Sequence, residues 1–87
     1  MIYRDLNIDG DQIRVFSESI DPIELKWHRD LEDREITAVG ETDWQIQLDD
    51  QLPQSISNVT IKKGAWHRLI KGTGELRIKI IKYCEFG

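Results

Sequence analysis

The sequence lacks the features that define several common classes of protein. Its 87 residues contain one cysteine, Cys84, so the chain can form neither an internal disulfide nor a metal cluster held by several cysteine thiolates. No apolar stretch approaches the roughly 20 residues of a membrane-spanning helix, and we therefore expect a soluble protein with no membrane partner. The first residues also lack the basic segment and apolar core of a secretory signal, which together with the scarcity of cysteine predicts a cytoplasmic location.

Positive charge is also in short supply. Twelve Lys and Arg residues stand against 16 Asp and Glu residues, so the formal net charge is −4. A protein that binds nucleic acid through its phosphates needs an excess of positive charge, and nucleic acid is therefore not expected as a partner. The chain nevertheless has the material for a folded core, since 39% of its residues are hydrophobic.

Alternation of apolar and polar residues predicts β-strands. The period of two is clearest over residues 43–49 and 75–83, with a bulge expected near Ile81. Weaker strand patterns, separated by turn residues, cover 2–8, 12–17, 23–28, 35–39, 55–61 and 66–70. We therefore predict an all-β fold, a small antiparallel jelly-roll barrel or β-sandwich formed by residues 1–87 as a single domain. Because a sandwich of this size has a thin core, we expect a second copy to cover part of it in a homodimer.

Two histidines, His28 and His67, are the main candidates for chemistry, and each is the middle residue of the tripeptide Trp-His-Arg. On an extended chain the side chains of His28 and Asp30 leave the same face. A turn after Asp30 would return Glu35 to the same interior, whereas His67 must be brought in by long-range pairing. Two imidazoles with one or two carboxylates form a donor set that suits Fe(II), Mn(II), Zn(II) or Ni(II). The alternative is a pair of strand histidines that interact only with neighbouring carboxylates.

The two histidine regions resemble the motifs of the cupin superfamily. The first cupin motif has His-x-His, three or four further residues and then Glu, and the segment from His28 to Glu35 is similar to it with Asp30 in place of the second histidine. The second motif has Pro-x-Gly-x-x-His, and the segment from Lys62 to His67 is similar to it with Lys62 at the proline position. The resemblance implies a barrel of six to eight strands whose mouth holds a divalent metal ion on His28, Glu35 and His67, with Asp30 as a fourth ligand.

Two kinds of function remain open. One is a metal-dependent protein that acts on a small polar molecule, and the resemblance implies isomerase, lyase or dioxygenase chemistry if the protein is an enzyme. The other is a metal-free β-barrel that serves as a binding or assembly module, with histidines that are structural or hold a small-molecule ligand. The two hypotheses differ in whether the side chains of His28, Glu35 and His67 converge on one point.

The tryptophans and the charged segment after Asp30 receive structural interpretations. Trp27 and Trp66 neighbour the histidines, so alternation places them on the opposite face, where we expect sheet packing or a dimer contact. Trp44 belongs either to the core or to a ligand pocket. Charged residues of the following segment, among them Glu32 and Arg34, are expected to form exchangeable ion pairs on the surface.

Overall fold

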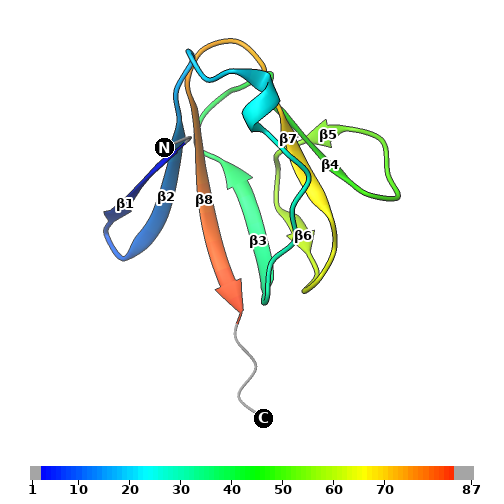
Figure 1. The fold of residues 1–87 in the computed structure, drawn as a ribbon. Coiled ribbons are helices and arrows are strands. Elements are labelled where there is room, and N and C mark those ends of the chain that lie inside the picture. Colours follow the sequence, from blue (N-terminus) through cyan, green and yellow to red (C-terminus); the bar gives the residue numbers. More distant parts are fainter. Residues whose placement is uncertain (1–2, 84–87) are drawn as a thin grey trace.

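The polypeptide forms two antiparallel β-sheets, with no α-helix among the described residues (Figure 1). The computed structural model describes residues 3–83. Its strands are β1 (Arg4–Ile8), β2 (Asp11–Phe16), β3 (Asp33–Ala38), β4 (Gln45–Leu48), β5 (Gln54–Ser55), β6 (Val59–Ile61), β7 (His67–Ile70) and β8 (Leu76–Tyr83). One 3-10 turn, η1 (Pro22–Glu24), lies between β2 and β3. Within residues 3–83, no helix has the length and apolar character needed to cross a membrane.

The sheets have different widths and do not join. The larger sheet has the strand order β1-β2-β8-β3-β6, and the smaller has the order β5-β4-β7. Every strand pairing in both sheets is antiparallel. The all-β antiparallel prediction is confirmed, and its form is an open β-sandwich, because the two sheets do not close into one barrel.

The core lies between the two sheets and is built by the predicted alternation. Ile36 on β3 and Ile78 on β8 belong to the larger sheet, and they share one hydrophobic cluster with Ile46 and Leu69 of the smaller sheet. Trp44, just before β4, is 1% exposed in the same cluster, and its indole Nε1 donates a hydrogen bond to the carbonyl of Gly74 (3.1 Å). Trp44 is therefore a core residue rather than part of a ligand pocket.

Residues 23–28 do not form the predicted strand. Asp21 caps η1, since its Oδ1 accepts a hydrogen bond from the N–H of Ile23 (3.0 Å), and Pro22 begins the turn, where its lack of an N–H carries no penalty. Between η1 and β3, His28 alone makes a β-type pairing. The apolar residues of this segment, such as Leu25, pack singly against the core without belonging to a strand.

Two other strand predictions need correction. The predicted strand 55–61 is interrupted, because Asn58 has a φ of 47° and a residue in the left-handed region cannot continue a strand. The predicted strand is therefore divided into the two short strands β5 and β6. The bulge expected near Ile81 is absent, since Ile81 pairs with Glu35 and Ile80 pairs with Ile36 in uninterrupted register.

Gly72 lies where the loop after β7 passes the start of the smaller sheet. A Cβ at this position would meet Oδ1 of Asp43 and would lie 2.6 Å from the backbone nitrogen of Trp44. The Asp43 carboxylate is held in place by hydrogen bonds from the N–H (2.7 Å) and the hydroxyl (2.9 Å) of Thr73. We expect Gly72→Ala to lower the free energy of unfolding by about 1–3 kcal/mol in urea denaturation. The exposed Ser57→Ala is the control, and equal losses in both variants would contradict the steric account.

Candidate metal centre

The two Trp-His-Arg tripeptides lie side by side and pair through their histidines. The N–H of His28 donates to the carbonyl of His67 and the N–H of His67 donates to the carbonyl of His28, both at 2.9 Å. Residues that face each other in an antiparallel pair project their side chains to the same side. The two imidazole rings accordingly meet edge to face, with centroids 4.1 Å apart. The long-range pairing that brings His67 to His28 is therefore present.

Both imidazoles are oriented by the same kind of hydrogen bond. Nδ1 of His67 lies 2.9 Å from the carbonyl of Ala65, and Nδ1 of His28 lies 3.2 Å from the carbonyl of Lys26. Because a carbonyl oxygen can only accept, Nδ1 carries the proton in each ring. In the neutral ring Nε2 then keeps a free lone pair. Histidines that bind a metal through one ring nitrogen commonly donate the N–H of the other nitrogen to a carbonyl in the same way.

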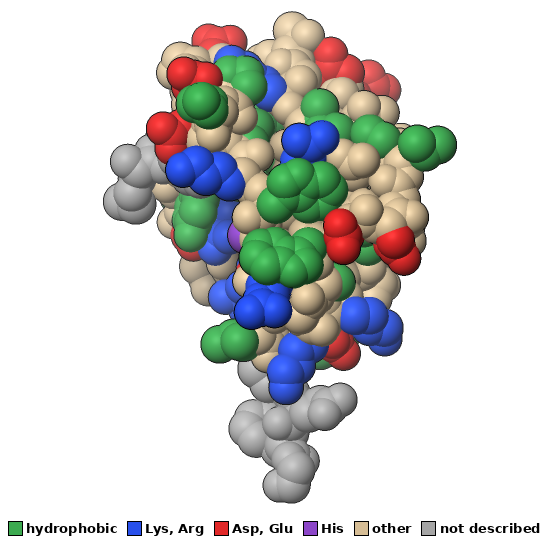
Figure 2. Space-filling view, turned by 45° about the vertical axis from the view of Figure 1, so that its right-hand side comes forward, with side chains coloured by type: hydrophobic (Ala, Val, Ile, Leu, Met, Phe, Trp, Pro, Cys, Tyr) green, Lys and Arg blue, Asp and Glu red, His purple; other side chains and the backbone are tan. Residues whose placement is uncertain are grey.

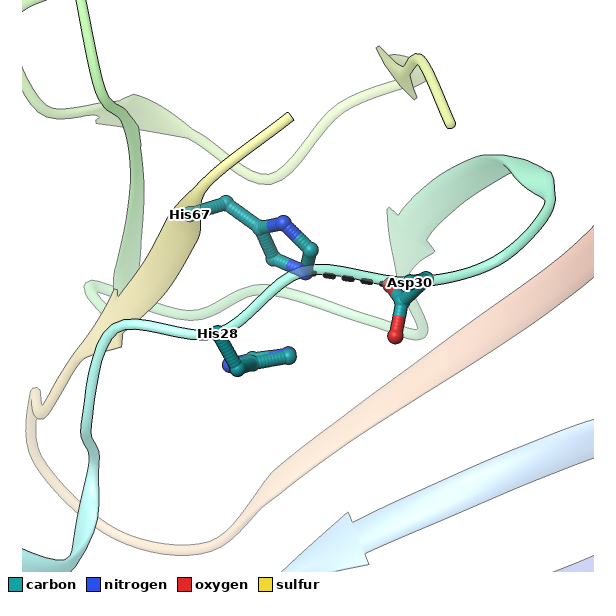
Figure 3. A group of neighbouring side chains, drawn as sticks. All are labelled: His28, Asp30 and His67. Carbon is teal, nitrogen blue, oxygen red and sulfur yellow. Dashed lines mark ion pairs between the residues drawn. The ribbon is translucent and has the colours of Figure 1, made fainter. Parts of the chain in front are cut away.

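Asp30 completes a group of three side chains (Figure 3). Its Oδ2 lies 3.2 Å from Nε2 of His67. One ring nitrogen of His28, one of His67 and a carboxylate oxygen of Asp30 all lie within 4.8 Å of one another. Within residues 3–83, Oδ2 of Asp30 is also a buried oxygen that accepts no hydrogen bond of good geometry. His28, Asp30 and His67 therefore lie close together, whereas the convergence that the sequence predicted also included Glu35.

The contact between His67 and Asp30 brings two hydrogen-bond acceptors together. His67 is 3% exposed, and its burial lowers the pKa of the imidazole more than the Ala65 carbonyl and the Asp30 carboxylate raise it. A neutral His67 with its proton on Nδ1 directs the Nε2 lone pair at a carboxylate oxygen 3.2 Å away. Two acceptors face each other there, and a cation that both of them bind would remove the repulsion.

Arg34 contacts the group of three side chains, a placement that the sequence interpretation missed. Its Nε and Nη2 lie 2.9 and 2.8 Å from Oε1 of Glu32, and its Nη1 lies 3.4 Å from Oδ2 of Asp30. The side chain is largely buried, so these contacts are not the exchangeable surface pairs that we expected. The alternation of β3 could have predicted this inward position, because Arg34 is two residues from the core residue Ile36 and shares its face.

Glu35 lies outside the group formed by His28, Asp30 and His67. Since Arg34 and Ile36 occupy the inner face of β3, alternation directs Glu35 to the outer face rather than to the interior that we expected. Its Oε2 accepts a hydrogen bond from the hydroxyl of Tyr83 (3.3 Å), and the negative charge raises the pKa of that tyrosine. The group of three side chains that converge does not include Glu35.

The tryptophans of the two tripeptides lie on the side of the paired segments that faces away from the histidine rings. The register that pairs the histidines sets Trp27 opposite Arg68 and Arg29 opposite Trp66. Each guanidinium stacks on the facing indole, at 4.8 Å from the Trp27 ring and 5.1 Å from the Trp66 ring. Trp27 and Trp66 are 38% and 43% exposed, and Figure 2 shows hydrophobic side chains in the middle of one face with basic side chains next to them. These contacts hold the backbone that carries the histidines.

Comparison with solved structures supports the fold. The chain is similar to the crystal structure of protein NMB1881 from Neisseria meningitidis, with a TM-score of 0.61 and 18% sequence identity over 94% of this chain and 82% of that one. It is also similar to the crystal structure of FeII HppE, with a TM-score of 0.60 and 12% identity over 93% of this chain and 48% of that one, so it spans about half the length of the HppE chain. No protein-family model and no curated protein matches the sequence. These likenesses indicate a cupin-like fold.

Proposed function

We propose that this protein binds a divalent metal ion through Nε2 of His28, Nε2 of His67 and the carboxylate of Asp30. The observation that carries the proposal is the pair of backbone carbonyls that receive the Nδ1 protons and leave both Nε2 lone pairs free, with Nε2 of His67 3.2 Å from a buried carboxylate oxygen. A buried polar atom without a partner is costly in a folded protein. A metal ion shared by these three side chains offsets that cost.

The separation between His67 and Asp30 supports one shared ion. Ligand atoms that each lie about 2.1 Å from one metal ion are about 3.0–3.4 Å apart when they are neighbours in its coordination shell. Nε2 of His67 and Oδ2 of Asp30 are 3.2 Å apart, which is within that range. The Nη1 of Arg34, 3.4 Å from the same oxygen, would act as an orienting group for the carboxylate rather than as a ligand.

The donor set also indicates which metals to test. Two imidazoles and one carboxylate with open positions form the set found in non-haem Fe(II) proteins, and the same donors accept Mn(II), Zn(II) and Ni(II). The structural neighbour HppE is described in its FeII form, which makes Fe(II) the first ion to examine. When bound, such a metal supplies Lewis-acid or redox chemistry to a small polar molecule.

Metal binding should be visible as stabilisation. We expect chelator-treated protein without a polyhistidine tag to take up about one metal ion per chain, measured by elemental mass spectrometry. A ligand at 100 times its Kd stabilises the native state by about 2.7 kcal/mol, so the Tm should rise by roughly 10–20 °C with the best of the four metals. Calcium serves as the control, since imidazole is a poor ligand for that ion.

The opposite result would favour the metal-free module. If none of the four ions binds or raises the Tm, the carboxylate of Asp30 functions as an ion-pair partner of Arg34, to which it already lies at 3.4 Å. The histidine pair would then be structural, with its two backbone hydrogen bonds and its ring contact as its role.

A further inference from the structure

A cavity of about 310 Å³ opens directly beside the proposed metal ligands. His28, Asp30 and Arg34 line it at one end. Its volume is at the small end of the range for ligand pockets, which favours a compact organic molecule. The chemistry of the remaining walls therefore indicates what class of molecule fits beside the metal ligands.

Apolar side chains form one part of the wall. Phe16 and Leu69 come from the buried core, and Leu25 of the segment after η1 packs against the same core. Tyr3 also lines the cavity, with its ring centroid 5.7 Å from that of Phe16. These surfaces accept an aromatic or aliphatic body and offer few groups for a polar one.

The second part of the wall carries an arginine in an unusual position. Arg14 is on β2 two residues before Phe16, so it projects from the inner face of the larger sheet, where its neighbour in register is the core residue Ile78. A cation beside the apolar residues Phe16 and Ile78 is unusual, because charged side chains are rarely buried in a core without a partner. Arg14 lines the cavity and so is available to a bound molecule.

Arg14 is also fixed in place. Its Nε and Nη2 donate to the two carboxylate oxygens of Asp5 at 2.8 and 3.1 Å, and its guanidinium lies 3.9 Å from the centre of the Tyr3 ring. The hydrogen bond from Arg14 lowers the pKa of Asp5, which keeps that carboxylate charged. Among residues 3–83, Nη1 has no hydrogen-bond partner and remains for another acceptor. Pre-ordering of this kind favours ligand binding, since the side chain loses little further freedom.

Three basic and two acidic side chains line the cavity, while Asp5 and Glu32, outside the lining, pair with two of the basic ones. Lys26 and Arg14 are basic groups on the wall, and Glu24 is the acidic group that opposes them. Asp30 and Arg34 compensate each other, and Arg34 is further committed to Glu32. A metal ion on the histidines would add positive charge at the same end of the cavity.

We propose that the cavity binds a small organic acid, with its carboxylate on Nη1 of Arg14 and its apolar body against Phe16 and Leu25. The inference rests on the proposed function in one respect, namely that the opposite end of this molecule lies beside the metal ligands. Charge-assisted hydrogen bonds from arginine are the strongest means that a protein has of selecting a carboxylate.

Benzoate and its neutral analogue benzamide provide the test. We expect benzoate to shift amide signals of the cavity residues in NMR titrations of both chelator-treated and zinc-loaded protein, and to bind at least about tenfold more tightly than benzamide. Arg14→Gln should remove that preference, while Arg77→Gln, which alters a half-exposed arginine paired with Glu75, should retain it. Equal affinities for benzoate and benzamide in the wild type would overturn the proposal without reference to any variant.

The two proposals fail separately. Zinc binding without benzoate binding would overturn the organic-acid site and leave the metal centre intact. Benzoate binding that depends on Arg14 in a protein that takes up no metal would support the acid site and overturn the proposed function. A folded Arg14→Gln variant that keeps wild-type affinity for benzoate would also refute the role of Arg14, and circular dichroism confirms the folded state.

Discussion

Asp30→Asn and His67→Ala are expected to lose metal binding, with a fall in affinity of more than about 100-fold, because the loss of a direct ligand should exceed the 10- to 100-fold effects of outer groups. Asp30 supplies the negative charge of the site, and its Oδ2 lies 3.2 Å from Nε2 of His67. Asparagine keeps the size and removes the charge, so the change tests the donor rather than the packing. Competition with a fluorescent zinc chelator measures the affinity of each variant.

Glu35→Gln is the matched control for the ligand variants. Glu35 is a carboxylate of the same region, but it lies outside the group of three converging side chains and accepts a hydrogen bond from Tyr83 instead. We expect its metal affinity to remain within about threefold of the wild type, well below the 10- to 100-fold loss that follows removal of a group that orients a ligand. A loss as large as that of Asp30→Asn would show that Glu35 enters the coordination shell when metal binds.

Asp30→Asn separates the two functional hypotheses in the metal-free protein as well. If Asp30 is retained for a metal, removal of its charge relieves the repulsion with the Nε2 lone pair of His67, and the free energy of unfolding should stay within about 1 kcal/mol of the wild type. If Asp30 is retained for its ion pair with Arg34, the variant leaves a largely buried guanidinium with one partner fewer and should lose more stability than that. Urea denaturation in the presence of a chelator distinguishes these results.

Trp44→Ala is expected to have the largest effect on stability. The side chain is 1% exposed, contacts both sheets of the core through its hydrophobic cluster and donates a hydrogen bond to Gly74. Replacement of a buried tryptophan by alanine costs about 3–5 kcal/mol, which is a large part of the roughly 5–15 kcal/mol that stabilises a small domain. The variant should therefore be substantially unfolded at low urea concentrations in circular dichroism.

Trp66→Ala is the control for Trp44→Ala. Trp66 is 43% exposed and makes a cation–π contact with Arg29, so its loss should cost about 1 kcal/mol. Comparable losses at the two positions would mean that the outer face of the histidine pair is as important to stability as the core.

The sequence alone predicted much of the architecture. Alternating apolar residues located most strands, because the side chains of a strand point to opposite faces with a period of two and this pattern depends only on the local sequence. The spacing of the histidines and carboxylates also named His28, Asp30 and His67 as candidates, together with Glu35, which lies outside the group of three. The segment 23–28 was assigned wrongly because a proline-initiated turn can carry the same apolar residues as a strand.

Only the tertiary structure decided which of the candidate groups lie together. Whether Arg34 or Glu35 faces the interior depends on the phase of β3, and a shift of one residue exchanges the two faces. The pairing of His28 with His67, and the carbonyls that orient their rings, arise between segments nearly 40 positions apart and leave no local pattern. Strand identity is a local property, whereas convergence of side chains requires the register of distant strands, and only the folded chain defines that register.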